Sequence, residues 1–196
     1  METKAIFGIL SAIFILLGGI PYLIGVHRNR IQPHILSWIG WAFITALGAF
    51  AMLASGSEWT VAILFANTLS CLIIAIYSII RKNGVWSTST YDYIFFGLGV
   101  LGLVLWQTLN LPILALICAI IADFFFGLPT IIKTFKSPKS ETYLAWSFSA
   151  FSGLLSLFAV KSFVFSDVAY PLYLFLFDLS VLLLILGIIR KKINNK

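Results

Sequence analysis

Long apolar runs separated by short polar stretches extend through almost the whole sequence. A bilayer core about 30 Å thick is crossed by roughly 20 apolar residues in an α-helix, and seven runs of about this length are present. They lie near residues 5–26, 34–54, 59–80, 91–109, 111–133, 143–160 and 168–189. The pattern therefore predicts an all-α transmembrane protein with seven helices.

The composition indicates a protein dissolved in lipid rather than in water. Of the 196 residues, 61% are hydrophobic and only 10% are charged, which leaves too little polar surface for a soluble domain. The first run is as long as a full span and lacks an obvious small-residue cleavage site, so we expect it to remain as a helix and not to be removed as a signal peptide. The expected location is the inner (plasma) membrane of a bacterium, a setting inferred from the compactness of the chain.

The connections between the runs indicate the orientation. With seven crossings, nearly all Lys and Arg fall on one side: Arg28, Arg30, Arg81, Lys82, Lys133, Lys136, Lys139, Arg190, Lys191, Lys192 and Lys196. Only Lys4 and Lys161 fall on the other. Because basic connections are retained in the cytoplasm, we expect the N-terminus outside and the C-terminus in the cytoplasm. The basic residues form short clusters and no single basic face, so no nucleic-acid partner is expected.

Two segments of the sequence match each other without a gap. Residues 19–52 align with residues 127–160. The matched pairs are Pro21/Pro129, Leu36/Leu144, Trp38/Trp146, Ala42/Ala150, Phe43/Phe151, Leu47/Leu155, Phe50/Phe158 and Ala51/Ala159. We interpret residues 1–82 and 111–196 as two three-helix bundles in the same orientation, joined by a linker helix in residues 83–110. Parallel repeats of this kind occur in transporters, with the substrate site between the copies.

The residues around the first connection of each copy carry a family resemblance. Gly19-Ile20-Pro21 and Gly127-Leu128-Pro129 are each followed by a short basic connection, after which Ser37-Trp38 or Ala145-Trp146 opens the next helix. This pattern resembles the PQ-loop and SWEET superfamily. The resemblance covers most of the chain and implies a 3+1+3 bundle with its N-terminus outside.

The resemblance leaves the substrate open. The chain has Pro21-Tyr22 and Pro129-Thr130 where the family has Pro-Gln. The segment Trp38-Ile39-Gly40-Trp41 is similar to the short Trp-x-x-Trp motif of the related PnuC-type vitamin transporters, which share the architecture.

Two aspartates lie near the centres of apolar runs, Asp123 in the fifth and Asp178 in the seventh. An ionised carboxylate at the bilayer centre costs at least about 2.5–3.5 kcal/mol, so each should point into the bundle, be protonated or have a partner. One interpretation is substrate binding or proton coupling. The other is a hydrogen-bonded aspartate that ties helices together, and for each residue alone the two are equally supported.

Three further residues are candidates for the walls of a cavity. Asn67 begins a mildly polar face in the third span, and the resemblance implies a polar residue at mid-height in the third and seventh helices, best matched by Asn67 and Asp178, although the repeat pairs Asp178 with Thr68. In the alignment of the two repeat copies, Ser149 corresponds to Trp41. An aromatic wall and a hydroxyl-bearing wall would suit a sugar or another planar solute. The alternative is that the small residues Ser149, Ser152, Gly153 and Ser156 merely let helices pack closely.

Four residues near the ends of spans have two interpretations each. Pro21 and Pro129 remove a backbone hydrogen bond and bend a helix, so they are either hinges for alternating access or simple helix terminators. Trp38 and Trp146 open their spans beside basic connections, where tryptophan rings commonly lie at the headgroup level, and this interfacial interpretation is favoured for both.

The leading hypothesis is a small-solute transporter that works by alternating access, with or without proton coupling, and moves a sugar, a vitamin or a similar polar solute. No phosphate loop, nucleophile motif or metal-spaced ligand set is present, so neither a cofactor, a metal nor an enzymatic activity is expected. A homo-oligomer is compatible with the sequence. The alternatives are a non-transporting interaction or scaffold protein of the same fold and, less favoured, an intramembrane enzyme.

Overall fold

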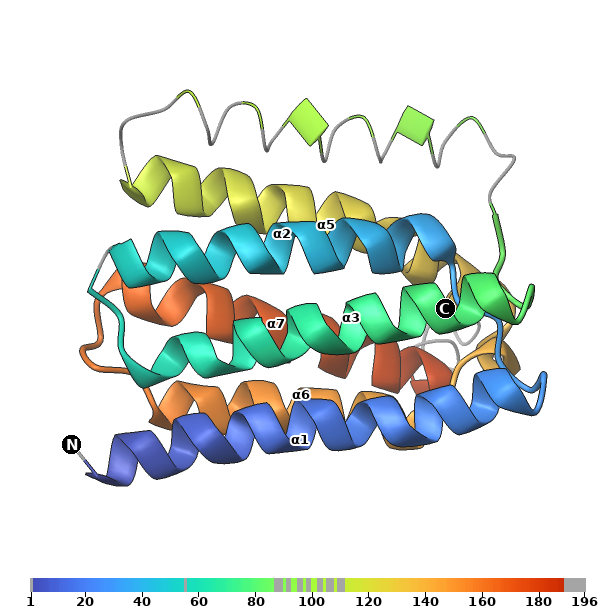
Figure 1. The fold of residues 1–196 in the computed structure, drawn as a ribbon, viewed down its shortest axis with the longest axis horizontal. Helices are drawn as coiled ribbons and strands as arrows, with labels where there is room; N and C mark the ends of the chain where they lie inside the picture. The colour runs from blue at the N-terminus through green and yellow to red at the C-terminus, as the bar shows by residue number, and fades with distance from the viewer. Residues whose placement is uncertain are drawn as a thin grey trace.

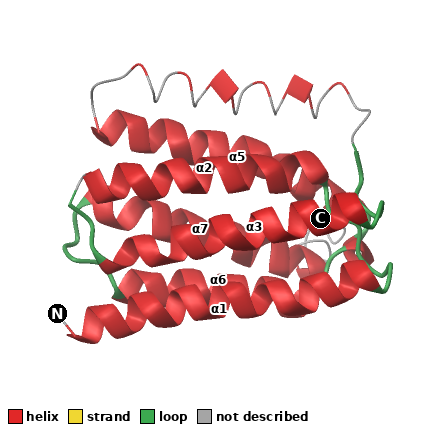
Figure 2. Ribbon diagram, in the orientation of Figure 1, coloured by secondary structure: helices red, strands yellow, loops and turns green. Residues whose placement is uncertain are grey.

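In the computed structural model the chain is all-helical and forms one bundle (Figures 1 and 2). The structure describes residues 2–54, 56–86 and 112–188, with isolated positions between residues 87 and 111. Within these residues the helices are α1 (Glu2–His27), α2 (Ile35–Ala54), η1 (Trp59–Val61), α3 (Ala62–Ile80), α5 (Pro112–Lys136), η2 (Pro138–Ser140), α6 (Tyr143–Phe158) and α7 (Phe165–Ile185). The predicted linker helix lies largely outside the described residues and stays a prediction.

The helices coincide with the apolar runs of the sequence. In a bilayer every backbone polar group must be satisfied within the protein, so an apolar run of this length folds as a helix. Within the described part of the chain, five segments are long and apolar enough to cross a membrane, and α6, at 16 residues, is a shorter apolar helix. The prediction of an all-helical protein is therefore confirmed for the described residues, and five of their segments have the length and composition needed to cross a membrane.

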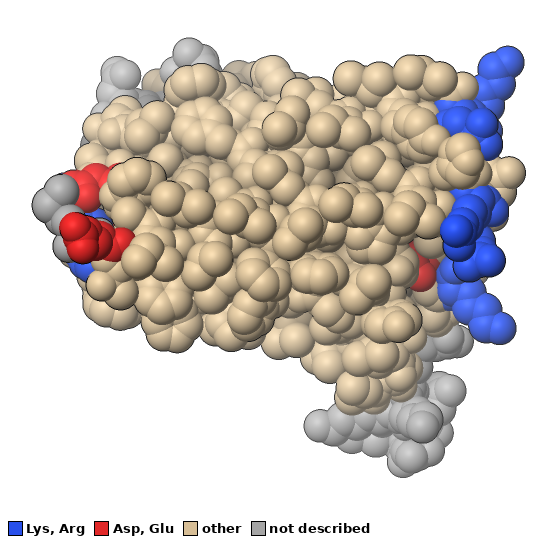
Figure 3. Space-filling view, turned by 60° about the horizontal axis from the view of Figure 1, so that its bottom comes forward, with Lys and Arg blue, Asp and Glu red and all other residues tan. Residues whose placement is uncertain are grey.

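The surface of the bundle has an apolar middle and charged ends. Large apolar side chains point outward on several helices, among them Ile6, Phe43, Phe50 and Leu176, each more than half exposed. Figure 3 shows Lys and Arg gathered at one end and Asp and Glu mostly at the other, with uncharged surface between them. An apolar surface of this extent is not found on monomers in water, and it fits a lipid environment.

The helices pack in a definite order. α1 lies against α3 and α6, α2 lies against α3 and α5, and α7 lies against α5 and α6. In Figure 1, α2 runs beside α5 and α1 beside α6. The centre of the bundle is therefore surrounded by all six of these helices.

A glycine permits the close approach of α6 and α7. A Cβ atom at Gly153 would lie 2.8 Å from Cα and 2.9 Å from the backbone nitrogen of Phe175. On the same helix, the Ser152 hydroxyl donates a hydrogen bond of 2.6 Å to the backbone oxygen of Ser11 in α1. At these two positions the small residues of α6 serve close helix packing.

We predict that Gly153→Ala destabilises the fold by about 1–3 kcal/mol, the usual cost of overpacking, because the backbone of Phe175 cannot rotate away. Gly19→Ala is the matched control, since its Cβ would meet only the Ser70 hydroxyl oxygen, at 3.0 Å, and that side chain can turn. The measurement is reversible unfolding in mixed detergent micelles. Equal losses for the two variants would contradict the assigned backbone contact.

Candidate functional site

A small cavity lies at the centre of the bundle, and each of the six α-helices named above contributes to its wall. Its volume is about 40 Å³, which is room for a few water molecules. The lining includes all five residues predicted for a solute or proton site: Trp41 from α2, Asn67 from α3, Asp123 from α5, Ser149 from α6 and Asp178 from α7. The structure thus brings together residues that lie far apart in the sequence.

Aromatic rings form one wall of the cavity. Trp41 packs edge-on against Trp38, Phe177 and Trp146, with ring centroids 5.3, 5.6 and 6.2 Å apart. All four side chains line the cavity. Trp38 and Trp146 are only 7% and 5% exposed, so the interfacial position favoured for them is wrong. Both rings turn inward and complete the aromatic cluster.

Asp123 is held firmly between helices. Its Oδ2 accepts a hydrogen bond of 2.6 Å from the Tyr170 hydroxyl, and its Oδ1 accepts one of 2.9 Å from the Tyr173 hydroxyl. The indole N–H of Trp41 donates to the Asp123 backbone oxygen at 3.2 Å. Asp123 therefore ties α5 to α7 and α2, as expected for a carboxyl group that links helices.

Asp178 differs from Asp123 because its carboxyl group has no hydrogen-bond partner in the described part of the chain. The side chain lines the cavity and is 9% exposed. A buried carboxyl group without a partner is costly in a membrane. Asp178 therefore presents unsatisfied hydrogen-bonding capacity to whatever occupies the cavity.

Asn67 and Ser149 supply the neutral polar groups of the predicted set. The Oδ1 of Asn67 faces the thiol of Cys71, which also lines the cavity, at 3.7 Å. Thr68, which the repeat pairs with Asp178, instead hydrogen-bonds Thr45 at 2.9 Å and does not line the cavity. Asn67 is therefore the polar residue that α3 presents to the cavity.

The two prolines lie inside helices. α1 continues past Pro21 to His27, and α5 continues past Pro129 to Lys136. Helix termination is therefore wrong for both, and the hinge interpretation stays a prediction.

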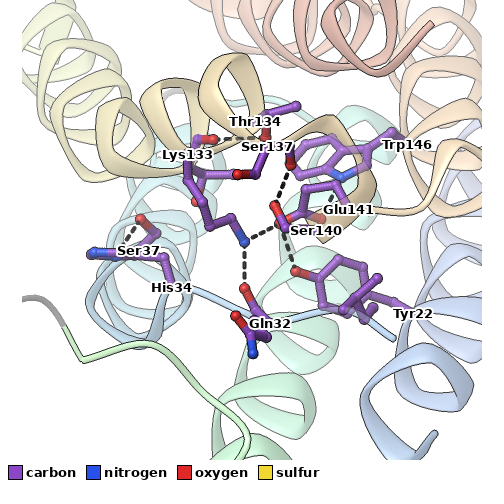
Figure 4. A network of polar contacts seen from close by, with 12 residues as sticks. Tyr22, Gln32, His34, Ser37, Lys133, Thr134, Ser137, Ser140, Glu141 and Trp146 are labelled. Carbon is purple, nitrogen blue, oxygen red and sulfur yellow. Dashed lines mark hydrogen bonds and ion pairs between the residues drawn. The ribbon is translucent and has the colours of Figure 1, made fainter. Parts of the chain in front are cut away.

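A buried network lies at the basic end of the bundle, centred on Glu141, which is 5% exposed. Its Oε1 accepts hydrogen bonds from Lys133 Nζ at 2.6 Å and from the Tyr22 hydroxyl at 3.1 Å, and its Oε2 accepts one from the Trp146 indole at 2.9 Å. Lys133 also donates to the backbone oxygen of Gln32 (Figure 4). Tyr22 and Trp146 also line the cavity, so these contacts, called the inner network below, lie directly beside the cavity on the side of the basic end.

A second buried carboxylate joins two connections at the opposite end. Asp167 Oδ1 accepts hydrogen bonds from Ser57 at 2.9 Å and from Thr60 at 3.2 Å. Its Oδ2 accepts from the backbone N–H groups of Lys161 at 2.6 Å and Ser162 at 3.0 Å. These contacts of Asp167, called the outer network below, join the connection between α2 and α3 to the connection between α6 and α7.

Sequence reasoning missed both networks. It used Lys133 only as an orientation signal and assigned no role to Glu141 or Asp167. One signal was available, because Glu141 is a single acid in a connection that otherwise carries Lys133, Lys136 and Lys139.

Comparison with known proteins gives no match to a protein-family model, to a curated protein or to a solved structure. Among the described residues no group of three or more His, Cys, Asp and Glu side chains is placed to hold a metal ion. The site must therefore be interpreted from its own chemistry.

We predict that Lys133→Met destabilises the protein by about 3–5 kcal/mol, because it leaves the Glu141 carboxylate buried without its cation. The double variant Lys133→Met/Glu141→Gln should recover much of this lost unfolding free energy. A double-mutant cycle, with unfolding followed in detergent, measures the recovery.

The exposed ion pair between Lys161 and Glu58, 2.9 Å long with side chains 53% and 44% exposed, provides the matched control. Exposed pairs contribute about 0–1 kcal/mol, so Glu58→Gln should have little effect. A Lys133→Met loss no larger than this control would show that the inner network does not stabilise the packing of the helices that it joins.

Proposed function

We propose that this protein is a small-solute transporter of the PQ-loop and SWEET type that works by alternating access. The observation that carries the proposal is the convergence of Trp41, Asn67, Asp123, Ser149 and Asp178, from five helices, on one central cavity. Polar groups inside a membrane bundle are tolerated where they line a cavity or bind a substrate. The solute then binds at the middle of the bundle.

The order of helix packing supports a protein built from two equivalent halves. Exchanging α1, α2 and α3 with α5, α6 and α7 leaves the set of principal contacts unchanged: α1–α3 becomes α5–α7, α2–α3 becomes α6–α7, and α1–α6 becomes α5–α2. This is the pattern expected for bundles 1–82 and 111–196 related by an axis along the membrane normal. The gathering of Lys and Arg at one end supports a cytoplasmic C-terminus in a bacterial inner membrane.

The two buried networks supply gates for alternating access. In the inner network the first half contributes Tyr22 and Gln32 and the second contributes Lys133, Glu141 and Trp146. In the outer network the first half contributes Ser57 and Thr60 and the second contributes Asp167. Both networks are intact in this structure. Transport requires each to break in turn while the other holds, with Pro21 and Pro129 as bending points.

Asp178 and Asp123 have different tasks in this mechanism. Asp178, which has no hydrogen-bond partner among the described residues, binds the solute or a proton that travels with it. Asp123 keeps α5 joined to α7 through Tyr170 and Tyr173. The Trp41 indole donates a hydrogen bond to the backbone oxygen of Asp123. It thereby connects the aromatic wall to the contact between α5 and α7.

A second candidate is a non-transporting interaction or scaffold protein with the same fold. The small volume of the cavity, about 40 Å³, and the close aromatic cluster favour it. The polar lining opposes it, because a bundle that only packs has no use for an unpartnered carboxyl group at its centre.

A flux assay distinguishes the two candidates. The protein is reconstituted in liposomes with an internal pH dye, and uptake is measured over a panel of labelled sugars, vitamins and amines. We expect uptake of at least one class, reduced at least tenfold in Asp178→Asn. Glu2→Gln, an exposed acid in the first turn of α1, serves as the control and should match the wild type. Uptake of no class, or equal uptake by Asp178→Asn and the wild type, would contradict the proposal.

A further inference from the structure

The lining of the central cavity contains acidic side chains and no basic ones among the described residues. It contains the carboxyl groups of Asp123 and Asp178 and, among the described residues, no Lys, Arg or His. The nearest buried network with a basic side chain has its Lys133 paired to Glu141 at 2.6 Å. Lys133 therefore does not balance the cavity, and an occupant must supply any positive charge there.

The two carboxyl groups differ in what they can offer an occupant. Both oxygens of Asp123 already accept hydrogen bonds from tyrosines. Asp178 accepts none from the described residues, although its side chain is 91% buried in a position that lines the cavity. A buried carboxylate is stable when a cation pairs with it. Asp178 is therefore the natural counter-ion for a positively charged group.

The aromatic wall suits the same kind of occupant. Cations are attracted to the faces of tryptophan and phenylalanine rings within about 6 Å of the ring centroid. Trp41, Trp146 and Phe177 line the cavity with centroids 5.6 to 6.5 Å from one another. Because these rings already pack on one another, a small cation in the cavity would meet the cluster from its cavity side, where Asp178 is also part of the lining.

A sugar fits this lining less well. Each sugar hydroxyl loses hydrogen bonds to water on entry and needs a protein partner in return. The predicted set offers Asn67 and Ser149 as neutral polar partners, whereas most of the remaining lining is aromatic, aliphatic or glycine.

We infer that the cavity selects an organic cation, a protonated amine or a quaternary ammonium group, held between the Asp178 carboxylate and the rings of Trp41, Trp146 and Phe177. This inference rests on the proposed function, in which the cavity is the solute site. Asn67 and Ser149 are placed to accept hydrogen bonds from the N–H groups of an amine.

The cavity of about 40 Å³ must widen to admit such a group. The inner network provides the means, because Trp146 and Tyr22 are both cavity lining and hydrogen-bond donors to Glu141. Breaking their bonds to Glu141 frees two walls of the cavity together. The small volume favours a compact cationic head, such as trimethylammonium.

Two pairs of probes of nearly equal shape isolate the effect of charge. Choline is compared with its uncharged carbon analogue 3,3-dimethyl-1-butanol, and cyclohexylammonium with cyclohexanol. Binding to the purified full chain in detergent is followed by thermal shift and by tryptophan fluorescence, since a ligand of the folded state raises the melting temperature. We expect at least one cation to bind at least tenfold more tightly than its neutral partner.

The Asp178→Asn variant should lose this preference for the cation while it still folds, because asparagine keeps the shape and removes the charge. Glu2→Gln, far from the cavity, should keep the preference. A Trp41→Phe variant, which keeps an aromatic face, should bind the cation more weakly without losing the preference. Equal binding within both pairs, binding of neutral probes alone, binding of none of the four, or an unchanged preference in Asp178→Asn would each overturn the inference.

The binding experiment is separate from the flux assay, so the two proposals can fail independently. Uptake of a neutral sugar or vitamin, with no preference for the cations, would overturn the cation inference and leave transport standing. A preference for cations that depends on Asp178, without uptake of any class, would support a cation-binding protein and contradict transport.

Discussion

A carboxyl group inside a membrane bundle needs a partner, and the partners of four such groups determine how this protein is assembled. Among the described residues Asp123, Glu141, Asp167 and Asp178 are buried. The first three are satisfied by hydrogen bonds from other segments of the chain, and they join the helices at the middle, the basic end and the opposite end of the bundle. Asp178 alone lines the cavity without a hydrogen-bond partner among the described residues, and the proposed function assigns the binding of the solute to it.

The same arrangement distinguishes the two ends of the bundle from its middle. The inner and outer networks at the two ends consist of hydrogen bonds and an ion pair, and water or other polar groups can replace these contacts. The contacts along the helices are apolar and close, as at Gly153, and do not exchange in this way. Motion of the halves about the cavity would therefore change the ends of the bundle more than its middle.

The sequence predicted the features that depend on local pattern. The apolar runs predicted the six described α-helices. The intramembrane polar residues and the repeat together predicted the five residues that line one cavity. It did not predict the partners of Asp123, because Tyr170 and Tyr173 become neighbours only when α5 packs on α7. Trp146 was assigned to the interface because position along a span does not reveal that the connection carrying Glu141 folds over it. Burial of a connection is a tertiary property, and both end networks were missed for that reason.

The central claim is that the cavity opens in turn to the two sides of the membrane. Cys71 lines the cavity and Cys118 is the other cysteine of the chain, so a Cys118→Ala variant carries a single natural reporter. The measurement is the rate at which a membrane-impermeant trimethylammonium thiosulfonate modifies Cys71 when it is added to one side of oriented vesicles, with Cys71→Ser as the blank. The account predicts modification from either side. Modification from one side only, or from neither, would contradict it.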